Sequence, residues 1–296
     1  ISKISSGSEY DIFQAIPLSA GPSDLPDEFT RRGRNSMDLN LIGKTVLITG
    51  GSKGIGKAVA AQMAEEGCNL HLASRTAGDL EAARDEIHAK YGVQVTIHPG
   101  DLSDGERMRK LAADTAGVDI LINNAGAIPS GSVNAVDEDT WRKAWDLKVF
   151  GYINLIREVY PVMCARGDGV ILNIIGTAGE RSVANYIAGS MANASIMAMT
   201  QALGGEAPHK GVRVLAVNPG LIETDRMVTL GEAQALEKHG DKTRWREMLL
   251  SNMPQGRAGS VEEVADVVTF LASPRASWVS GTVLTIDAGM TKRAGL

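Results

Sequence analysis

Residues 49–56 read Thr-Gly-Gly-Ser-Lys-Gly-Ile-Gly, between the apolar run 45–48 and a stretch with helical periodicity. Gly50, Gly54 and Gly56 would let the chain turn tightly and let the phosphates of a ligand approach the backbone. The positive end of the following helix would attract the same phosphates. No Gly-Lys-Ser/Thr follows in P-loop spacing, so the stretch predicts a binding site for the pyrophosphate of a dinucleotide.

Further short apolar runs follow along the chain, and helical patterns lie between them. Together with the first run, they are residues 45–48, 70–73, 93–97, 118–122, 170–175, 212–217 and 283–286. Because the runs are apolar nearly throughout, they suit strands that are buried on both faces of a parallel sheet. The pattern predicts an α/β fold: a single doubly wound, Rossmann-type domain with a seven-stranded parallel sheet and helices on both faces.

Composition excludes several classes of protein. Of 296 residues, 44% are hydrophobic, and 30 basic against 35 acidic side chains give a net charge of -5. This balance does not favour nucleic acid or an anionic membrane as partner. Cys68 and Cys164 cannot form a disulfide framework, and no Cys/His spacing indicates a metal site, so we expect no metal and a cytoplasmic location.

The chain divides unevenly. Residues 1–36 contain three prolines and a basic cluster without sustained periodicity, so we expect a leader or N-terminal extension outside the fold. An ordered arm that packs on a neighbouring subunit is the alternative. Residues 37–296 are predicted to form one dinucleotide-binding catalytic domain. A long polar, Met-rich insertion at 221–260 is predicted to be a lid, since loops of that length in a compact fold are usually functional.

The end of the second apolar run indicates which dinucleotide binds. An acid there would accept a hydrogen bond from a ribose 2′-OH and repel a 2′-phosphate. Instead Ser74 and Arg75 follow the run, and Lys53 lies in the glycine loop. Two cations at this corner favour the 2′-phosphate of NADP, because charge-assisted contacts to phosphate are strong. The alternative is that both are solvated surface cations.

Several motifs in order extend this pattern from about Leu41 to Gly289. They are the glycine loop, Asp101-Leu102, Asn123-Asn124-Ala125-Gly126, Tyr186 at the start of an Ala-rich helix, Asn218-Pro219-Gly220 with Thr224, and the segment 281–289 around Asp287. In these motifs the chain resembles the short-chain dehydrogenase/reductase (SDR) family. The resemblance implies an NADP(H)-dependent oxidoreductase that interconverts a carbonyl and a secondary alcohol.

The resemblance also implies which residues bind the cofactor. Asp101 would meet the adenine, Asn123 and Gly126 would line the adenosine-ribose side, and Ile222 and Thr224 would hold the nicotinamide amide. The full set predicted to contact the cofactor is Gly50, Ser52, Lys53, Gly54, Ile55, Gly56, Ser74, Arg75, Asp101, Leu102, Asn123, Ala125, Gly126, Tyr186, Pro219, Gly220, Ile222 and Thr224.

The catalytic residues depart from the family pattern of Asn, Ser, Tyr and Lys. Tyr186 is present, but the Lys position four residues later holds Ser190. The Ser position falls on Gly176, with Thr177 as the nearest hydroxyl, and the Asn position holds Lys148. The stretch from Gly176 to Tyr186 is also shorter than is usual in the family.

A free tyrosine has a pKa near 10, so Tyr186 needs a nearby cation to work as an acid and base at neutral pH. Our hypothesis is that Lys148 supplies this relocated cation, while Ser190 contacts the ribose or a bridging water. Two alternatives stay open. Thr177 or Glu180 could take a direct role, or Lys148 could be a surface residue and the protein a nucleotide-binding sensor or scaffold without redox activity.

Met227, Trp245 and Leu249 in the lid suggest a small, apolar carbonyl or alcohol substrate, although they could equally pack the lid onto the body. No basic cluster in the lid indicates a strongly acidic substrate. The helical patterns at 141–166 and 185–207 are expected to expose apolar stripes that include Tyr152, Leu155, Ile187, Met191, Ile196 and Met199. Because isologous pairing is common and the resembled family pairs through such helices, we expect a homotetramer or homodimer.

Overall fold

The computed structural model describes residues 37–251 and 253–293. The described residues from Leu39 onward belong to one compact unit. The expectation for residues 1–36 therefore lies outside the described residues, and the predicted domain boundaries stay predictions. No helix among the described residues is long and apolar enough to cross a membrane.

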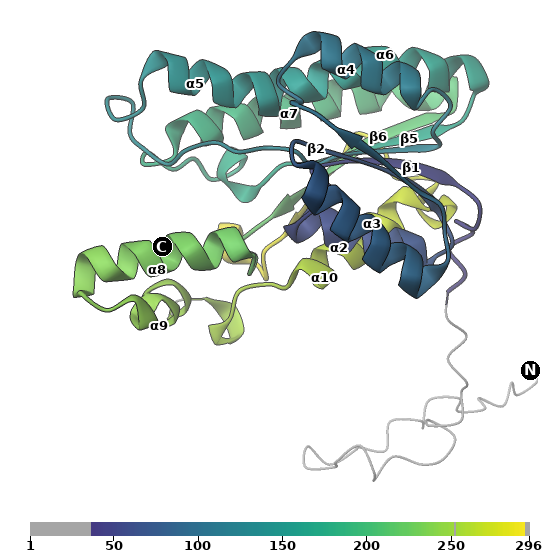
Figure 1. Cartoon of the computed structure of the whole chain (residues 1–296). Coiled ribbons are helices and arrows are strands. Elements are labelled where there is room, and N and C mark those ends of the chain that lie inside the picture. Colours follow the sequence, from purple (N-terminus) through teal and green to yellow (C-terminus); the bar gives the residue numbers. More distant parts are fainter. Residues whose placement is uncertain (1–36, 252, 294–296) are drawn as a thin grey trace, which may run out of the picture. The chain divides into compact units, whose positions relative to one another are not determined.

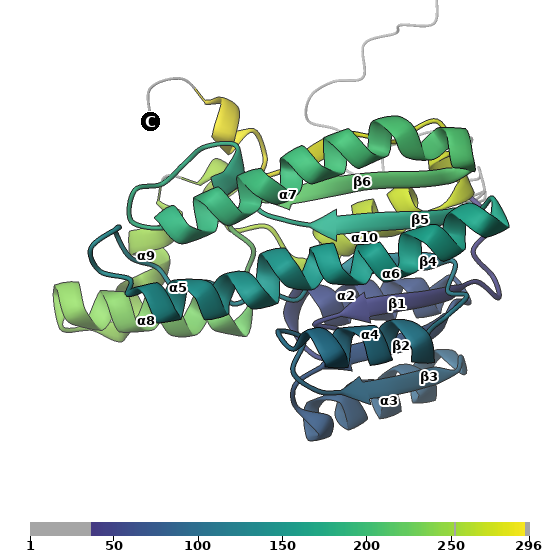
Figure 2. The same ribbon diagram turned by 90° about the horizontal axis from the view of Figure 1, so that it is seen from above.

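A seven-stranded sheet is the centre of the unit, and every strand pair in it is parallel (Figures 1 and 2). The strand order is β3-β2-β1-β4-β5-β6-β7. The strands are β1 (Thr45–Thr49), β2 (Asn69–Ser74), β3 (Val95–Pro99), β4 (Ile120–Asn123), β5 (Gly169–Ile174), β6 (Val212–Pro219) and β7 (Val283–Ile286). Each of the seven apolar runs thus overlaps a strand, and the predicted fold class is confirmed.

Helices cover both faces of this sheet (Figure 1). On one face lie α2 (Gly54–Glu65), α3 (Ala77–Tyr91) and α10 (Val261–Ala272). On the other lie α4 (Gly105–Asp114), α6 (Gly151–Arg166) and α7 (Ile187–Glu206). Short 3-10 turns occupy Thr177–Gly179, Ala207–Lys210, Lys242–Arg244, Pro254–Gly256, Pro274–Ala276 and Met290–Lys292.

Burial follows the position of each strand in the sheet. Every residue of β5 and β6 is buried, as the continuous apolar runs predicted. The edge strands β3 and β7 are only partly buried. Two apolar clusters, one on each face, therefore hold the central strands rigidly, and the ends of these strands provide a fixed frame for a site.

A wide, π-helical turn joins α5 (Glu138–Trp145) to α6. It spans Asp146–Phe150 and carries Lys148, which is buried. Turns of this kind often lie at functional sites, because they interrupt the regular helical register and redirect a side chain. Here the turn directs Lys148 toward the end of β5.

The predicted lid contains two helices, α8 (Asp225–His239) and α9 (Trp245–Leu250), which lie beyond one end of the sheet (Figure 1). Trp245 is 5% exposed and packs with Ala235, Leu250 and Ala258 in a cluster of its own. Met227 and Leu249 lie at the margin of this cluster. Part of the lid's apolar content therefore holds the lid together.

The expected apolar stripe on α6 and α7 was right for Met191 and wrong for three of its other members. Tyr152, Leu155 and Ile196 are each no more than 1% exposed, because they face the sheet. The exposed apolar residues of these helices include Val162 at 45% and Met191 at 49%. A helical pattern alone could not separate the two faces, since both are apolar.

Two adjacent glycines of α7 should respond in opposite ways to alanine. A Cβ on Gly204 would lie 2.3 Å from the Val214 carbonyl oxygen, whereas a Cβ on Gly205 would meet nothing within 4 Å. Gly204→Ala should lower the free energy of unfolding by about 1–3 kcal/mol through overpacking. Gly205→Ala should raise it by about 0.5 kcal/mol, because alanine favours helix. Urea unfolding measures both, and shifts in the same direction would contradict this packing.

Candidate active site

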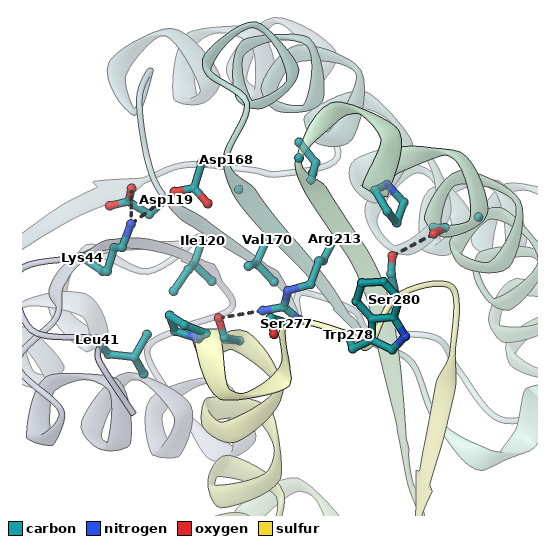
Figure 3. Close-up of a pocket in the computed structure, with 18 residues that line it drawn as sticks. Leu41, Lys44, Asp119, Ile120, Asp168, Val170, Arg213, Ser277, Trp278 and Ser280 are labelled. Atoms are coloured by element: carbon teal, nitrogen blue, oxygen red, sulfur yellow. Dashed lines mark hydrogen bonds and ion pairs between the residues drawn. The ribbon is translucent and has the colours of Figure 1, made fainter. Parts of the chain in front are cut away.

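One cleft, of about 610 Å³, lies at the amino ends of the strands (Figure 3). Its charged groups are already engaged within the protein. Lys44 Nζ lies 3.4 Å from Asp119 Oδ1 and 3.3 Å from Asp168 Oδ2. The buried Arg213 donates to the carbonyl oxygens of Leu271 (2.8 Å) and Ser273 (3.0 Å) at the end of α10. These contacts join the amino ends of the strands to one another. They leave the charges of Lys44 and Arg213 with partners inside the protein.

A second cleft, of about 730 Å³, lies at the carboxyl ends of the strands, where ligands bind in open α/β sheets. It is lined by segments that follow β1, β4, β5 and β6 and by the lid. The residues used below are Gly50, Lys53, Gly54, Ile55, Asn124, Ala125, Gly126, Ile128, Lys148, Gly176, Thr177, Tyr186, Asn193, Pro219, Gly220, Leu221, Ile222, Thr224, Arg226, Met227 and Leu249. Most of the residues predicted from the sequence thus meet in one cleft.

The glycine loop needs its glycines. Gly50 has φ +66°, in the left-handed region, and a Cβ on Gly56 would lie 2.2 Å from the Gly50 carbonyl oxygen. Helix α2 starts at Gly54, and no side chain caps its amino end. An uncapped helix start beside a tight glycine turn fits a pyrophosphate, which would satisfy the open N–H groups.

Asn124 attaches the end of β4 to this loop. Its Nδ2 donates to the carbonyl oxygens of Thr49 (3.1 Å) and Gly50 (3.2 Å). Its backbone N–H, together with that of Ala125, donates to Thr49 Oγ1, at 2.9 and 3.1 Å. Asn124 therefore fixes the conformation of the glycine loop. Its place in the motif indicated a role in the site, but the sequence did not indicate this one.

The corner at the end of β2 carries the residues predicted to select NADP. Ser74 Oγ donates to Ser52 Oγ at 3.1 Å, and Arg75 is exposed. Lys53 Nζ forms an ion pair with Asp79 Oδ2 at 2.9 Å. This arrangement leaves Arg75 and the two hydroxyls at the corner, while Lys53 would have to exchange Asp79 for a phosphate.

Asp101 and Asn123 are already engaged within the protein, and Leu102 is buried in the core. Asp101 Oδ1 accepts hydrogen bonds from Ser103 N (3.0 Å) and Ser103 Oγ (2.8 Å), which lower the pKa of the carboxyl group. Leu102 is 3% exposed and packs in the core. Asn123 is fully buried and donates from Nδ2 to Asn173 Oδ1 at 3.0 Å. Any contact of Leu102 or Asn123 with a cofactor would involve main-chain atoms.

The segment after β6 turns sharply into the lid. A Cβ on Gly220 would lie 2.7 Å from Asp287 Cβ, so the close approach requires glycine. Thr224 Oγ1 accepts a hydrogen bond from Met227 N at 3.2 Å and caps α8. The segment that brings Pro219, Gly220 and Ile222 to the cleft is therefore held at Gly220 by its close packing on Asp287 and at Thr224 by the start of α8.

Tyr186 precedes α7, and its hydroxyl has no hydrogen-bond partner among the described residues. Its backbone is held by a bridge to Gly131, whose N–H donates to the Asn185 carbonyl oxygen at 2.8 Å. Burial raises the pKa of Tyr186, and the positive charge of Arg226 opposes that shift. The phenol is thus protonated at neutral pH and open to the cleft.

Lys148 reaches the same cleft from the wide turn before α6. Its Nζ donates to the carbonyl oxygens of Ile174 (2.9 Å) and Ile175 (3.3 Å) and to Tyr152 Oη (3.2 Å). Burial lowers the pKa of Lys148 to about 7. Within the described chain, no hydrogen bond joins Lys148 to Tyr186. The two groups share a cleft, but the lysine is held by the end of β5.

Gly176 occupies the family's serine position in a conformation that only glycine adopts readily, with φ +136°. Its carbonyl oxygen accepts from Asn193 Nδ2 at 3.2 Å, and its N–H donates to Asn218 Oδ1 at 3.3 Å. Thr177 follows and lines the cleft. The buried residues Asn193 and Asn218 therefore fix the backbone at Gly176, where the family pattern predicts a serine.

Ser190, in the family's lysine position, is 3% exposed and does not line the cleft. Its Oγ accepts a hydrogen bond from Val183 N at 3.0 Å, within the loop that leads to Tyr186. Glu180 in the same loop accepts from Thr285 Oγ1 at 2.7 Å and pairs with Lys292. The loop is therefore fastened at two points, and the predicted ribose contact of Ser190 stays a prediction.

Arg226 is the residue at this cleft that sequence reasoning missed. It stands in the first turn of α8, where the positive end of the helix dipole disfavours a cation. That misplaced charge was a signal in the sequence. The place of Arg226 beside the cleft could not be predicted, because its contact with Ile128 joins segments that are 98 positions apart.

A doubly wound sheet with a pyrophosphate loop and an open tyrosine at the carboxyl ends of the strands defines a dinucleotide-dependent oxidoreductase. A family model described as "Enoyl-(Acyl carrier protein) reductase" matches residues 50–291. The chain is 32% identical to 3-oxoacyl-[acyl-carrier-protein] reductase FabG of Vibrio harveyi over 85% of this chain and 99% of that protein.

Two further relatives support the same assignment. The NADPH-dependent reductase BacG of Bacillus subtilis is 31% identical, with 84% of this chain and 98% of that protein covered. The structure of L-sorbose reductase from Gluconobacter frateurii, complexed with NADPH and L-sorbose, superposes with a TM-score of 0.82 at 29% identity, covering 87% of this chain and all of that one. The chain belongs to the short-chain dehydrogenase/reductase family.

Restoring the family's serine should fail in this framework. Gly176→Ser would place a Cβ 3.0 Å from Asn193 Nδ2 in a backbone conformation that costs about 1–3 kcal/mol for other residues. We expect a loss of about 2 kcal/mol in the free energy of unfolding and no gain in turnover. Gly92→Ser is the control for the backbone cost alone, because Gly92 also has a positive φ (+73°) but nothing within 4 Å of an added Cβ, so it should lose less stability than Gly176→Ser. Wild-type stability with faster turnover in Gly176→Ser would contradict the described geometry.

Proposed function

We propose that the protein interconverts a carbonyl and a secondary alcohol on a small, largely apolar substrate, with Tyr186 as general acid and base and Lys148 as the relocated cation. The observation that carries the proposal is the shared cleft: the unpartnered Tyr186 hydroxyl and the buried Lys148 amine line the space that begins at the glycine loop. The membership in a family of reductases favours an enzyme over the sensor or scaffold considered from the sequence.

The cofactor is NADP(H), as in the NADPH-dependent relatives. When bound, it supplies a hydride to the carbonyl carbon or takes one from the alcohol. The glycine loop and the uncapped start of α2 would hold the pyrophosphate. Arg75, Lys53 and the hydroxyls of Ser52 and Ser74 would hold the 2′-phosphate, since they supply positive charge and donors at one corner.

In the direction of reduction, Tyr186 donates its phenolic proton to the carbonyl oxygen as the carbon receives the hydride. The C=O double bond becomes a C–OH single bond, and a phenolate is left on Tyr186. A buried phenolate is unfavourable, because burial already raises the pKa of this group. The step therefore needs a nearby positive charge and a source of replacement protons.

Lys148 meets both needs. It is 7% exposed, and no carboxylate of the described residues lies within ion-pair distance, so its charge is poorly screened inside the cleft. Its three hydrogen-bond acceptors are all neutral. With a pKa of about 7, the amine can lose and regain a proton at neutral pH, the range in which proton transfer is most effective.

Ser190 and Thr177 have separate proposed roles. Ser190 is a positioning residue, because its hydroxyl holds Val183 and so fixes the loop that ends at Tyr186. Thr177 lines the cleft beside Gly176 and would donate its hydroxyl to the substrate oxygen. The apolar walls formed by Ile128, Leu221 and other cleft residues suit an apolar substrate body.

We also propose association into a homodimer or homotetramer. The exposed apolar residues Phe150, Val162 and Met191 on neighbouring helical segments support a contact between copies of the chain. Static light scattering measures this state directly, and a monomer at working concentration would exclude it.

Removing the Tyr186 hydroxyl tests the proposed acid. Tyr186→Phe should lower the rate of carbonyl reduction by about 10²–10⁴, the usual contribution of a positioned acid. Binding of NADPH, followed by fluorescence, should change little. Tyr91→Phe is the control, because Tyr91 ends α3, outside the cleft. Unchanged turnover in Tyr186→Phe would rule out this role.

The pH dependence tests Lys148. A lowered pKa leaves the amine charged below about pH 7 and neutral above it, so the reduction rate should fall as pH rises through about 7. Lys148→Arg keeps the charge and should lose this limb of the profile, while Lys148→Met should be slow at every pH. Thermal unfolding confirms that each variant folds. A Lys148→Met enzyme with the wild-type rate and profile would refute the relocation.

A further inference from the structure

Arg226 presents the accessible positive charge of the cleft. Its side chain is exposed, and it forms no ion pair with any acid in the described part of the chain. The other cations that line the cleft are engaged: Lys53 pairs with Asp79 at 2.9 Å, and Lys148 is buried against main-chain carbonyls. An anion that enters the cleft from the lid side therefore meets Arg226.

A single main-chain contact places this guanidinium at the mouth of the cleft. Arg226 Nη2 donates to the Ile128 carbonyl oxygen at 3.3 Å, which joins the first turn of α8 to the segment after β4. That segment continues to Gly131, which bridges Tyr186. Arg226 and Tyr186 are thus both joined to the segment 128–131, and both line the cleft. The guanidinium of Arg226 uses one of its five N–H donors in this bond, so the others remain for a ligand.

Neither helix stability nor packing explains an arginine here. A cation in the first turn opposes the helix dipole, and Thr224 already caps the helix. The positive charge of Arg226 acts on the Tyr186 phenol, where it opposes the rise in pKa that burial causes. The walls beside it, Leu221, Met227 and Leu249, are apolar. Asp225 also lines the cleft, but it forms no ion pair with Arg226 among the described residues. An arginine above apolar walls matches a ligand with an apolar body and one negatively charged end.

We infer that Arg226 binds a carboxylate of the substrate, so that the natural substrate is an oxo acid, or the corresponding hydroxy acid, with an apolar body. This inference rests on the proposed function, because it names the substrate class of the same site. A guanidinium suits a carboxylate best, since its planar fork can donate two parallel hydrogen bonds. The carboxylate would fix the distance from Arg226 to the carbonyl that Tyr186 protonates.

The test compares acids with neutral analogues that share the carbonyl. The probes are acetoacetate, levulinate and 2-oxooctanoate, each beside its methyl ester. Wild-type enzyme should prefer at least one acid over its ester in kcat/KM. Arg226→Met should lower kcat/KM for that acid by about 10- to 100-fold more than for its ester, because only the acid loses a charge-assisted contact. Arg226→Lys should retain part of the preference.

Arg244→Met is the matched control. Arg244 lies in the same lid segment, pairs with Glu247 at 3.0 Å and does not line the cleft, so its loss should leave both rates unchanged. Equal losses for acid and ester in Arg226→Met, with a shifted pH profile, would mean that Arg226 acts on the phenol alone and would overturn the inference. Reduction of esters or simple ketones without any preference for an acid would also overturn it, while the proposed function would stand.

A binding measurement separates the two proposals. Isothermal titration of the same acids into the NADP⁺-loaded protein should show binding that weakens by about tenfold or more in Arg226→Met. If the wild type binds an acid through Arg226 but reduces none of the compounds, the inference stands and the proposed carbonyl chemistry fails. If none of the acids binds, the inference is overturned.

Discussion

The buried ammonium group of Lys148 is the interaction on which the site depends. Its hydrogen bonds to the carbonyl oxygens of Ile174 and Ile175 tie the wide turn before α6 to the last residues of β5. A buried charge with only neutral acceptors is unfavourable, and its lowered pKa expresses that cost. Packing of its aliphatic chain holds Lys148 in place. The chain fills the space beside Gly126, where an added Cβ would lie 2.6 Å from Lys148 Cδ.

The departures predicted from the family's catalytic pattern fall at positions that are in contact in the structure. Ser190 bonds Val183 at 3.0 Å, so the short loop packs directly on the position where the family places a lysine. A longer side chain at 190 would displace that loop. The same loop begins at Gly176, whose main-chain groups are held by Asn193 and Asn218. One loop therefore constrains both positions, because Gly176 is held through its main chain and Ser190 through its hydroxyl.

The fold could be predicted because its signals are local. Each apolar run fell on a strand, and the glycine loop lay where the motif predicted, since both depend on near neighbours in the sequence. The site was harder. Motif position suggested Lys148 as the relocated cation, but it could not indicate its partners at Ile174 and Ile175, which lie 26 and 27 residues away. Leu102 and Asn123 belong to a cofactor motif, yet their side chains proved to be buried because motif membership does not fix orientation.

Charge is the property that composition described least well. The net charge of -5 gave no reason to expect an anionic ligand. Three positive side chains line the cleft, however: Lys53 in the glycine loop, Lys148 at the end of β5 and Arg226 in the first turn of α8. They differ in their partners. Asp79 neutralises Lys53, neutral carbonyls surround Lys148, and a single carbonyl contacts Arg226. Because screening depends on the nearest groups rather than on the total, an acidic protein can present a positive cleft.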